Sequence, residues 1–202
     1  MTRTDLLVLH TLRCVGHAAL PRVADTTGLA RSEAESELID LAVAGFVTRT
    51  AGEFGGWGLT PAGRAVDEQR IAAELEAAAA RDTVAAAYQE FLVLNPELLE
   101  LCTAWQMRQI GGVAVPNEHT DAGYDARVLG LFVAFDERAA VVCASLASAL
   151  ARFARYQVRL AQALARARAG ERDYLTDSME SYHVVWFQLH EDLLATLGLP
   201  RV

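Results

Sequence analysis

The stretch from residue 20 to residue 63 constrains the fold more than any other part of this 202-residue chain. Within it, residues 23–27 read as a short helix, and Gly28 after them can adopt the left-handed backbone that turns a chain. A second helix is expected with Ser32 as its N-cap, because Glu35 follows three residues later at capping-box spacing. Two short helices joined in this way predict a helix-turn-helix motif.

A hairpin is expected directly after this motif. Residues 46–48 read as a strand, residues 51–56 as a turn rich in glycine, and residues 57–59 as the returning strand. Before the motif, residues 4–15 carry an apolar stripe at helical spacing. The N-terminal third is therefore predicted as three helices followed by a two-stranded wing.

Beyond residue 61 the pattern is helical. Residues 62–94 are dense in alanine and predict one long helix that connects two domains. Asn95 and Pro96 are expected to start the next helix, residues 111–123 to form an irregular loop, and residues 124–169 to break near Asp136 or Ser148. A last helix is expected from Ser178 to Gly198. The predicted fold is mainly α: a winged helix-turn-helix domain over residues 1–70, joined by a long helix to a helical bundle over residues 71–202.

The composition narrows the class of protein. The chain is 52% hydrophobic, but no segment reaches 18 uninterrupted apolar residues, so no membrane-spanning helix is expected. The acid and hydroxyl groups at the N-terminus are unlike a signal peptide. Three scattered cysteines suit a reducing cytoplasm, where we expect them to be buried as small hydrophobic residues. A cytoplasmic protein without cofactor, metal or membrane partner is predicted.

Two segments of the N-terminal third resemble a known family. The run Leu-Ala-Val-Ala-Gly-Phe-Val-Thr-Arg over residues 41–49 and the run Leu-Thr-Pro-Ala-Gly-Arg over residues 59–64 are similar to the winged-helix domain of MarR-type bacterial transcriptional regulators. The resemblance covers about residues 5–70. It implies a homodimer that binds double-stranded DNA, with the second helix of the motif in the major groove and the wing on the backbone or in the minor groove. The residues placed at DNA are Arg22, Arg31, Ser32, Glu35, Ser36, Arg49 and Arg64.

The charge of this region supports an alternative. Residues 1–70 contain seven arginines and nine acids, and the predicted reading helix carries four acids with Arg31. The wing tip at residues 52–56 has no basic residue, unlike the acid-x-arginine element common in the family. Phosphate contacts supply much of the affinity for DNA. The alternative is that the winged helix is an adaptor that binds another protein.

Polar and aromatic residues are concentrated in the helical part of the chain. Burying polar groups costs free energy unless they are paired, so they predict either a hydrogen-bonded network or a pocket for a small-molecule effector. His183 and His190 are seven residues apart, about 10.5 Å along a helix, so they cannot share a metal ion. The candidate pocket residues are Trp105, Arg108, Asn117, His119, Tyr124, Tyr182, His183, Trp186 and His190.

The remaining sequence patterns give little evidence of a catalytic or anion-binding site. The arginine-rich run over residues 152–159 is predicted to be a solvated helix face. The chain has no nucleophile elbow, P-loop or dinucleotide-binding glycine pattern. We therefore expect a protein that is not an enzyme.

Overall fold

Over its described residues, the chain folds into a mainly helical structure that contains two small hairpins. The computed structural model describes residues 2–52 and 55–200, so Glu53 and Phe54 at the predicted wing tip lie outside the described residues. In chain order the elements are α1 (Thr4–Val15), α2 (Leu20–Thr27), α3 (Arg31–Val43), β1 (Val47–Thr50), β2 (Gly56–Leu59), α4 (Pro61–Ala77), α5 (Arg81–Gln106), β3 (Met107–Ile110), β4 (Val113–Pro116), α6 (Ala122–Ala149), the 3-10 turn η1 (Ala151–Phe153), α7 (Ala154–Arg168), α8 (Asp173–Thr176) and α9 (Tyr182–Leu197).

We call α1 to α4 the N-terminal unit. Its core is formed by apolar residues of α1, α2, α3 and β1, among them Leu9, Val23 and Leu38, which are fully buried. Gly28 ends α2 with a φ of 76°, the left-handed conformation expected for this turn. The hairpin pairs β1 with β2 in antiparallel register, from Val47 opposite Leu59 to Thr50 opposite Gly56.

The structure at the start of α4 explains why Thr60 and Gly63 occur in the run at residues 59–64. Thr60 caps α4 by accepting a hydrogen bond from the Gly63 backbone N–H at 3.0 Å, and its hydroxyl donates to the Gly45 carbonyl at 2.7 Å. A Cβ atom on Gly63 would lie 1.8 Å from the Phe46 carbonyl oxygen. Glycine is therefore required here because the backbone of α4 touches the backbone that enters β1.

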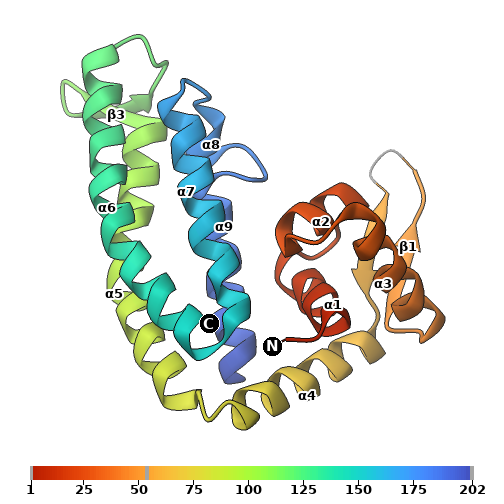
Figure 1. The fold of residues 1–202 in the computed structure, drawn as a ribbon. Helices are drawn as coiled ribbons and strands as arrows, with labels where there is room; N and C mark the ends of the chain where they lie inside the picture. Colours follow the sequence, from red (N-terminus) through yellow and green to blue (C-terminus); the bar gives the residue numbers. More distant parts are fainter. Residues whose placement is uncertain (1, 53–54, 201–202) are drawn as a thin grey trace.

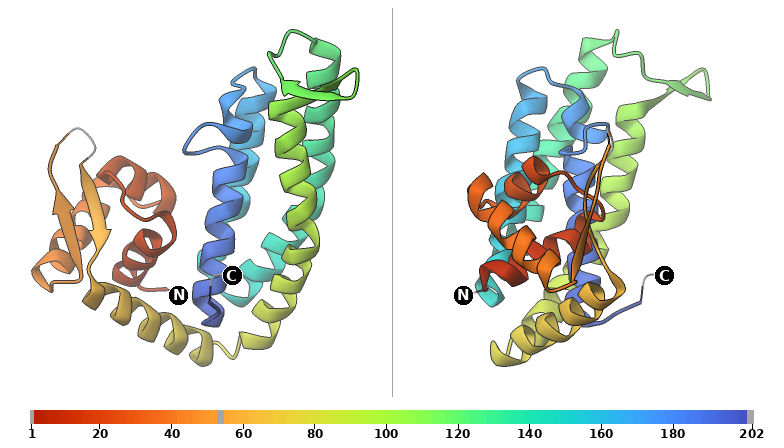
Figure 2. Two further views of the ribbon diagram at one scale, coloured as in Figure 1. Left: turned by 180° about the vertical axis from the view of Figure 1, so that it is seen from behind. Right: turned by 90° about the vertical axis from the view of Figure 1, so that its right-hand side faces the viewer.

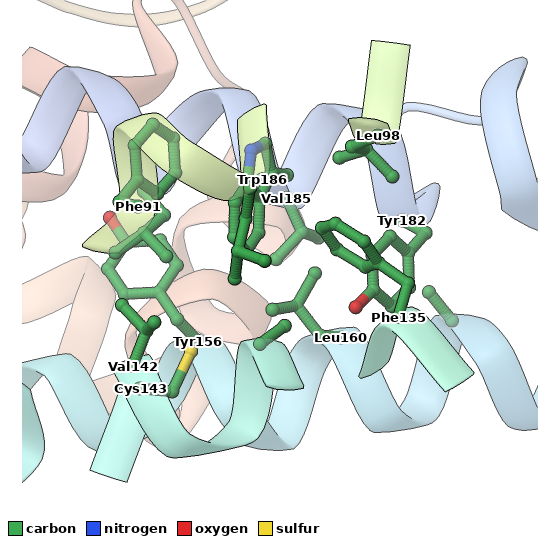
Figure 3. Packing of buried hydrophobic residues seen from close by; sticks show 14 of the residues in the cluster. Phe91, Leu98, Phe135, Val142, Cys143, Tyr156, Leu160, Tyr182, Val185 and Trp186 are labelled. Carbon is green, nitrogen blue, oxygen red and sulfur yellow. The ribbon is translucent and has the colours of Figure 1, made fainter. Parts of the chain in front are cut away.

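We call α5 to α9 the C-terminal unit. Its separate core gathers aromatic residues of α5, α6, α7 and α9 (Figure 3). The rings of Phe91 and Trp186 stack with centroids 4.4 Å apart, and Phe135 meets Trp186 edge-on at 5.3 Å. All three cysteines are buried and free, as predicted.

The boundaries of the long helices differ from the sequence prediction. The single helix expected over residues 62–94 ends at Ala77, because Ala79 takes a left-handed φ of 48° and turns the chain into α5. Pro96 lies inside α5 and does not begin a new helix. Gly111 and Gly112, both with positive φ, form the turn of a second hairpin where an irregular loop was expected. The break expected near Ser148 is confirmed, since α6 ends at Ala149.

Helices α1 to α3 and the C-terminal unit lie side by side above α4 (Figure 1). Figure 1 and the left view of Figure 2 show α4 running along the base of the molecule from the β1–β2 hairpin to α5. Helices α1 and α4 both pack against α9. Helix α3 and the β1–β2 hairpin lie on the side of the N-terminal unit farthest from the bundle. Among the described residues, no helix is long and apolar enough to cross a membrane.

Candidate functional site

Helix α3 and the β1–β2 hairpin form a notch on the outer face of the N-terminal unit. The notch has a volume of about 370 Å³, and its lining includes Arg31 and Glu35 from α3 and Arg49 and Trp57 from the hairpin. The guanidinium of Arg49 lies 5.8 Å from the centre of the Trp57 ring. Helix α3 begins at Arg31 after Ala30, so Ser32 is not the N-cap that we expected. The notch brings one cation from each element to a shared concave surface.

The rest of the exposed face of α3 is acidic and partly apolar. Burial raises the pKa of Glu37 and the neighbouring carboxylates of Asp5, Asp40 and Glu33 raise it further, so this surface carries an excess of negative charge. Two apolar side chains of α3 also face solvent, Ile39 at 49% exposure and Val43 at 85%. Ser32 and Ser36 are exposed on the same helix.

Two of the residues that the sequence places at DNA lie elsewhere. Arg22 is largely buried, and its Nε atom lies 3.6 Å from Glu180 in the C-terminal unit. Arg64 lines a different cleft, together with Phe187 and Leu194 of α9. The structure therefore brings Arg31, Glu35 and Arg49 to the notch, leaves Ser32 and Ser36 exposed on the same helix, and separates Arg22 and Arg64 from them.

The nine residues predicted as an effector pocket divide into two groups with separate partners. The first group surrounds the β3–β4 hairpin. Asn117 donates to the Trp105 carbonyl at 3.0 Å, His119 Nδ1 lies 3.0 Å from a carboxylate oxygen of Asp125, and the His119 ring is 4.7 Å from that of Trp105. The Tyr124 hydroxyl donates to the Ala104 carbonyl at 2.7 Å. These contacts join the end of α5 to the start of α6.

Within this first group, Arg108 donates to Asp121 at 2.9 Å and lies over the Tyr124 ring. Arg108 and Tyr124 line an open hollow of about 380 Å³, whose lining does not include Trp105, Asn117 or His119. The predicted common pocket is therefore not assembled at this end of the bundle.

The second group lies on α9, where Tyr182 and Trp186 are part of the aromatic core. Tyr182 donates to Asp136 at 2.9 Å and Trp186 donates to the Asn95 side chain at 3.1 Å. The His190 ring is tilted against the Phe91 ring, with centroids 5.0 Å apart. His183 is half-buried on the same helix. Hydrogen bonds within the protein thus satisfy the polar atoms of Tyr182 and Trp186, and neither requires a ligand.

Sequence reasoning missed the most charged region of the interior, which we call the ionic junction. It joins His10 of α1 and Asp67 of α4 to Asp192 of α9. His10 Nδ1 lies 3.1 Å from both carboxylate oxygens of Asp67, and His10 Nε2 lies 3.0 Å from Asp192 Oδ1. Because a carboxylate has no proton to donate, both ring nitrogens must be protonated, and His10 is an imidazolium.

Asp192 is the centre of this junction. Its carboxylate also accepts hydrogen bonds from Arg152 Nη1, from Arg155 Nη2 at 2.9 Å and from the Tyr156 hydroxyl at 2.8 Å. Arg152 Nε donates to Glu74 of α4 at 2.8 Å. Asp192, His10 and the Arg152 side chain are completely buried. The prediction that residues 152–159 form a solvated helix face is therefore wrong for Arg152 and Arg155. Both side chains point inward, between the two units.

The charges of the junction balance. The three carboxylates of Asp67, Glu74 and Asp192 face the three cations His10, Arg152 and Arg155. Burial alone would raise the pKa of Asp192, but Arg152, His10 and Arg155 hold it well below its usual value. Burial alone would lower the pKa of His10, but Cys14, Asp192 and Asp67 outweigh burial and Arg152, and the pKa is well above its usual value.

One part of the junction has the spacing of a metal site. Atoms of His10, Cys14 and Asp192 that are able to ligate an ion lie within 4.8 Å of one another. However, His10 Nε2 is already bonded to Asp192, and Arg152 and Arg155 place two positive charges against the same carboxylate. A further cation would be repelled there. We therefore interpret the junction as a network of ion pairs and hydrogen bonds among protein groups.

Comparisons with known proteins do not place this arrangement in a family. No family model, no curated protein and no solved structure matched the chain.

Proposed function

We propose that the protein is a transcriptional regulator that binds double-stranded DNA as a homodimer through the outer face of its N-terminal unit. In this proposal α2 and α3 are a helix-turn-helix and the β1–β2 hairpin is its wing. The observation that carries the proposal is the notch in which Arg31 of α3 and Arg49 of the hairpin face the same open surface. This surface lies on the side away from the bundle (Figure 1), so a duplex can approach it freely.

The residues of the notch suit the two parts of DNA recognition. Arg31, Ser32, Glu35 and Ser36 occupy the first turns of α3, the part of a recognition helix that contacts base edges. Arginine reads guanine, glutamate accepts from cytosine, and serine pairs with several bases. Arg49 on β1 is placed to contact phosphate, which positions the protein without reading sequence.

The salt dependence of binding tests this proposal. With two cations of each protomer at the duplex, Arg31 and Arg49, a dimer neutralises no more than about four phosphates, and the slope of log affinity against log salt is expected to be no steeper than about −3.6. Four arginines per protomer, the number suggested by sequence, would double that slope. Fluorescence anisotropy with a pool of duplexes enriched by repeated selection at low salt provides the measurement.

Two matched variants separate specific from general effects. Arg49→Gln is expected to weaken binding to all duplexes alike and to reduce the slope, whereas Ser36→Ala is expected to alter the preferred sequence. Arg127→Gln, which removes an exposed arginine of the bundle, is the control and should leave both properties unchanged. The absence of binding to every duplex at low salt would overturn the proposal.

The bundle is the proposed dimer surface. Apolar side chains remain exposed on α5 and α6, and covering them with a second copy would remove apolar area from water. They are Leu92, Val93, Leu99, Leu131 and Val141. Light scattering at micromolar concentration is expected to give the mass of a dimer, and Val93→Glu is expected to shift the mass toward that of a monomer.

The second candidate function is an adaptor that binds another protein through α3. The acids around Glu37 and the exposed side chains of Ile39 and Val43 favour it, since an apolar strip flanked by charge is typical of a protein-binding surface. Val43→Glu distinguishes the two functions. It should leave DNA binding nearly unchanged in a regulator, because Val43 is at the far end of α3 from the notch, and it should abolish binding to the partner of an adaptor.

A further inference from the structure

The β3–β4 hairpin projects sideways from the end of the bundle where α5 passes into α6 (right view of Figure 2). Its base is fixed to the bundle, because the Asn117 backbone N–H donates to the Gln106 carbonyl at 2.8 Å. Its far end is a tight turn in which Gly111 and Gly112 both have positive φ. A hairpin of two strands is marginally stable in water unless one of its faces packs against something, so a contact at the projecting end would stabilise it.

The projecting end of this hairpin is apolar on one face. Ile110 and Val113 lie opposite each other in register, so both side chains are on the same face of the two-stranded sheet. They are 58% and 62% exposed. We call these two residues the hairpin tip. Exposed apolar side chains that lie together on a projecting element indicate an interaction surface.

The hollow of about 380 Å³ lies at the base of the same hairpin. Residues of α5 and β3 line it, together with Tyr124 of α6. Half of the lining is apolar or aromatic, namely Leu99, Ala104, Met107 and Tyr124, and Leu99 is 47% exposed. The other lining residues are polar: Glu100, Thr103, Arg108 and Gln109. This end of the chain therefore presents an apolar projection and, beside it, a partly apolar recess.

A projection and a recess on one surface suit contact with a second copy of the chain. In a two-fold symmetric contact every surface is used twice. When the hairpin tip of one copy enters the hollow of the other, the reverse contact forms at the same time. A partner of a different kind would cover the tip or fill the hollow, but it would not require both on the same molecule.

The hairpin also continues the surface that we propose for the dimer. Four exposed residues of α5 follow one another at intervals of four, three and four residues, which places them on one side of the helix; they are Leu92, Pro96, Leu99 and Thr103. Leu99 and Thr103 belong to the hollow, so this stripe leads into it. Stable interfaces bury about 1,200–2,000 Å² in total, which is more than a hairpin tip provides. The α5 stripe and the hairpin are therefore parts of one contact.

We propose that two copies of the chain exchange their β3–β4 hairpins, with Ile110 and Val113 of each copy packed in the hollow of the other. The proposal specifies the contact of the homodimer in the proposed function and rests on that homodimer, but it does not depend on DNA binding. The exchange removes the apolar side chains of both tips from water. It also fixes the register of the two copies, because each tip has one recess to enter.

Disulfide cross-linking between two variants of the full chain tests the contact directly. Val113→Cys places a thiol on the hairpin tip, and Glu100→Cys places one in the hollow. The three natural cysteines are buried, so they should not react. Mixing the two variants under mild oxidation, with a small tag on one of them, is expected to give a cross-linked mixed dimer. Val113→Cys mixed with Ser148→Cys, exposed at the other end of α6, is the control and should give none.

Loss of the apolar tip provides a second measurement. The double variant Ile110→Ser, Val113→Ser is expected to raise the dissociation constant of the dimer at least about tenfold in analytical ultracentrifugation, because each copy loses the burial of two apolar side chains. Both residues are exposed, so the fold should be retained, which circular dichroism checks. Val158→Ser, at an exposed valine of α7, is the matched control and should leave the dissociation constant unchanged.

The outcomes separate this proposal from the proposed function. A dimer that Val93→Glu disrupts, but that gives no mixed cross-link and tolerates the double variant, would overturn the hairpin exchange and keep the dimer through α5 and α6. A chain that is monomeric at micromolar concentration would overturn the exchange and the proposed homodimer together. A cross-linked dimer that binds no duplex at low salt would support the exchange and overturn only the proposed function.

Discussion

Replacing Asp192 with asparagine tests whether the ionic junction holds the two units together. Asparagine has nearly the same shape, but it is neutral, and its amide nitrogen is a donor that would face other donors. The carboxylate of Asp192 accepts from His10, Arg152 and Arg155 in a fully buried position. The substitution therefore changes the charge of the buried junction from zero to +1 and leaves cations without their counterion.

The magnitude follows from this uncompensated charge. Removing one partner of a buried ion pair costs about 3–5 kcal/mol. For a chain of this size, 1 kcal/mol shifts the melting temperature by roughly 2–4 °C, so Asp192→Asn is expected to lower it by about 6–20 °C. The effect should be complete at neutral pH. The pKa of Asp192 is depressed, so its contribution is present above the unfolded value of about 3.9 and is lost only as the pH falls through the lower folded value.

Thermal and urea unfolding, each followed by circular dichroism, provide the measurements. Glu97→Gln is the control, since it removes a carboxylate paired with Arg138 at the surface and should leave the melting temperature almost unchanged. The two cores are separate, with Trp57 packed on one and Trp186 within the other. Tryptophan fluorescence should therefore show Asp192→Asn unfolding in two steps. A melting temperature within about 2 °C of that of the natural chain would refute the reasoning, because a loss of only 1 kcal/mol would already lower it by about that much.

Three further outcomes are expected from the structure. Gly63→Ala should destabilise the protein by about 1–3 kcal/mol in urea unfolding, because the new methyl group would overlap the Phe46 carbonyl; an unchanged midpoint would show that α4 can shift without cost. Asn95→Ala should cost about 1–3 kcal/mol by leaving the buried Trp186 indole nitrogen unpaired, and Asn95→Asp should restore part of that loss. His10→Gln should be most destabilising below about pH 6.5, where the imidazolium contributes fully, and the difference from the natural chain should shrink as alkaline pH approaches the raised folded pKa of His10; unfolding curves at pH 6, 8 and 10 would reveal a gap that instead widens.

The sequence predicted the local structure of the N-terminal unit because its signals are local. The left-handed turn at Gly28 depends on neighbouring residues alone. The cap expected at Ser32 was wrong, because α3 begins before it, at Arg31 after Ala30. The turn of the second hairpin was also readable, since Gly111 and Gly112 between two short apolar runs are typical of a tight hairpin, but we interpreted that segment as a loop.

The errors in helix length have physical causes that a periodicity argument does not contain. Ala79 adopts a left-handed conformation, but nothing in the alanine-rich sequence around it indicates that the helix ends there. Pro96 removes one backbone hydrogen bond from α5, but it is exposed, and so is Leu92, whose carbonyl loses its partner. Water can satisfy that carbonyl, which reduces the cost of continuing the helix past the proline.

The contacts of the candidate site are even harder to predict from local sequence than the helix boundaries. Polar residues within an apolar helical stripe indicate that a partner is needed, but not which one. For Trp186 the partner is Asn95, distant in sequence, and for His10 the partners are 57 and 182 residues away. Arg155 and Arg159 lie one turn apart on α7 and look equivalent in sequence, yet Arg155 donates to Asp192 in the ionic junction, whereas Arg159 donates to Glu180. The partner of each arginine is therefore set by what the fold brings opposite it, which the local sequence does not contain.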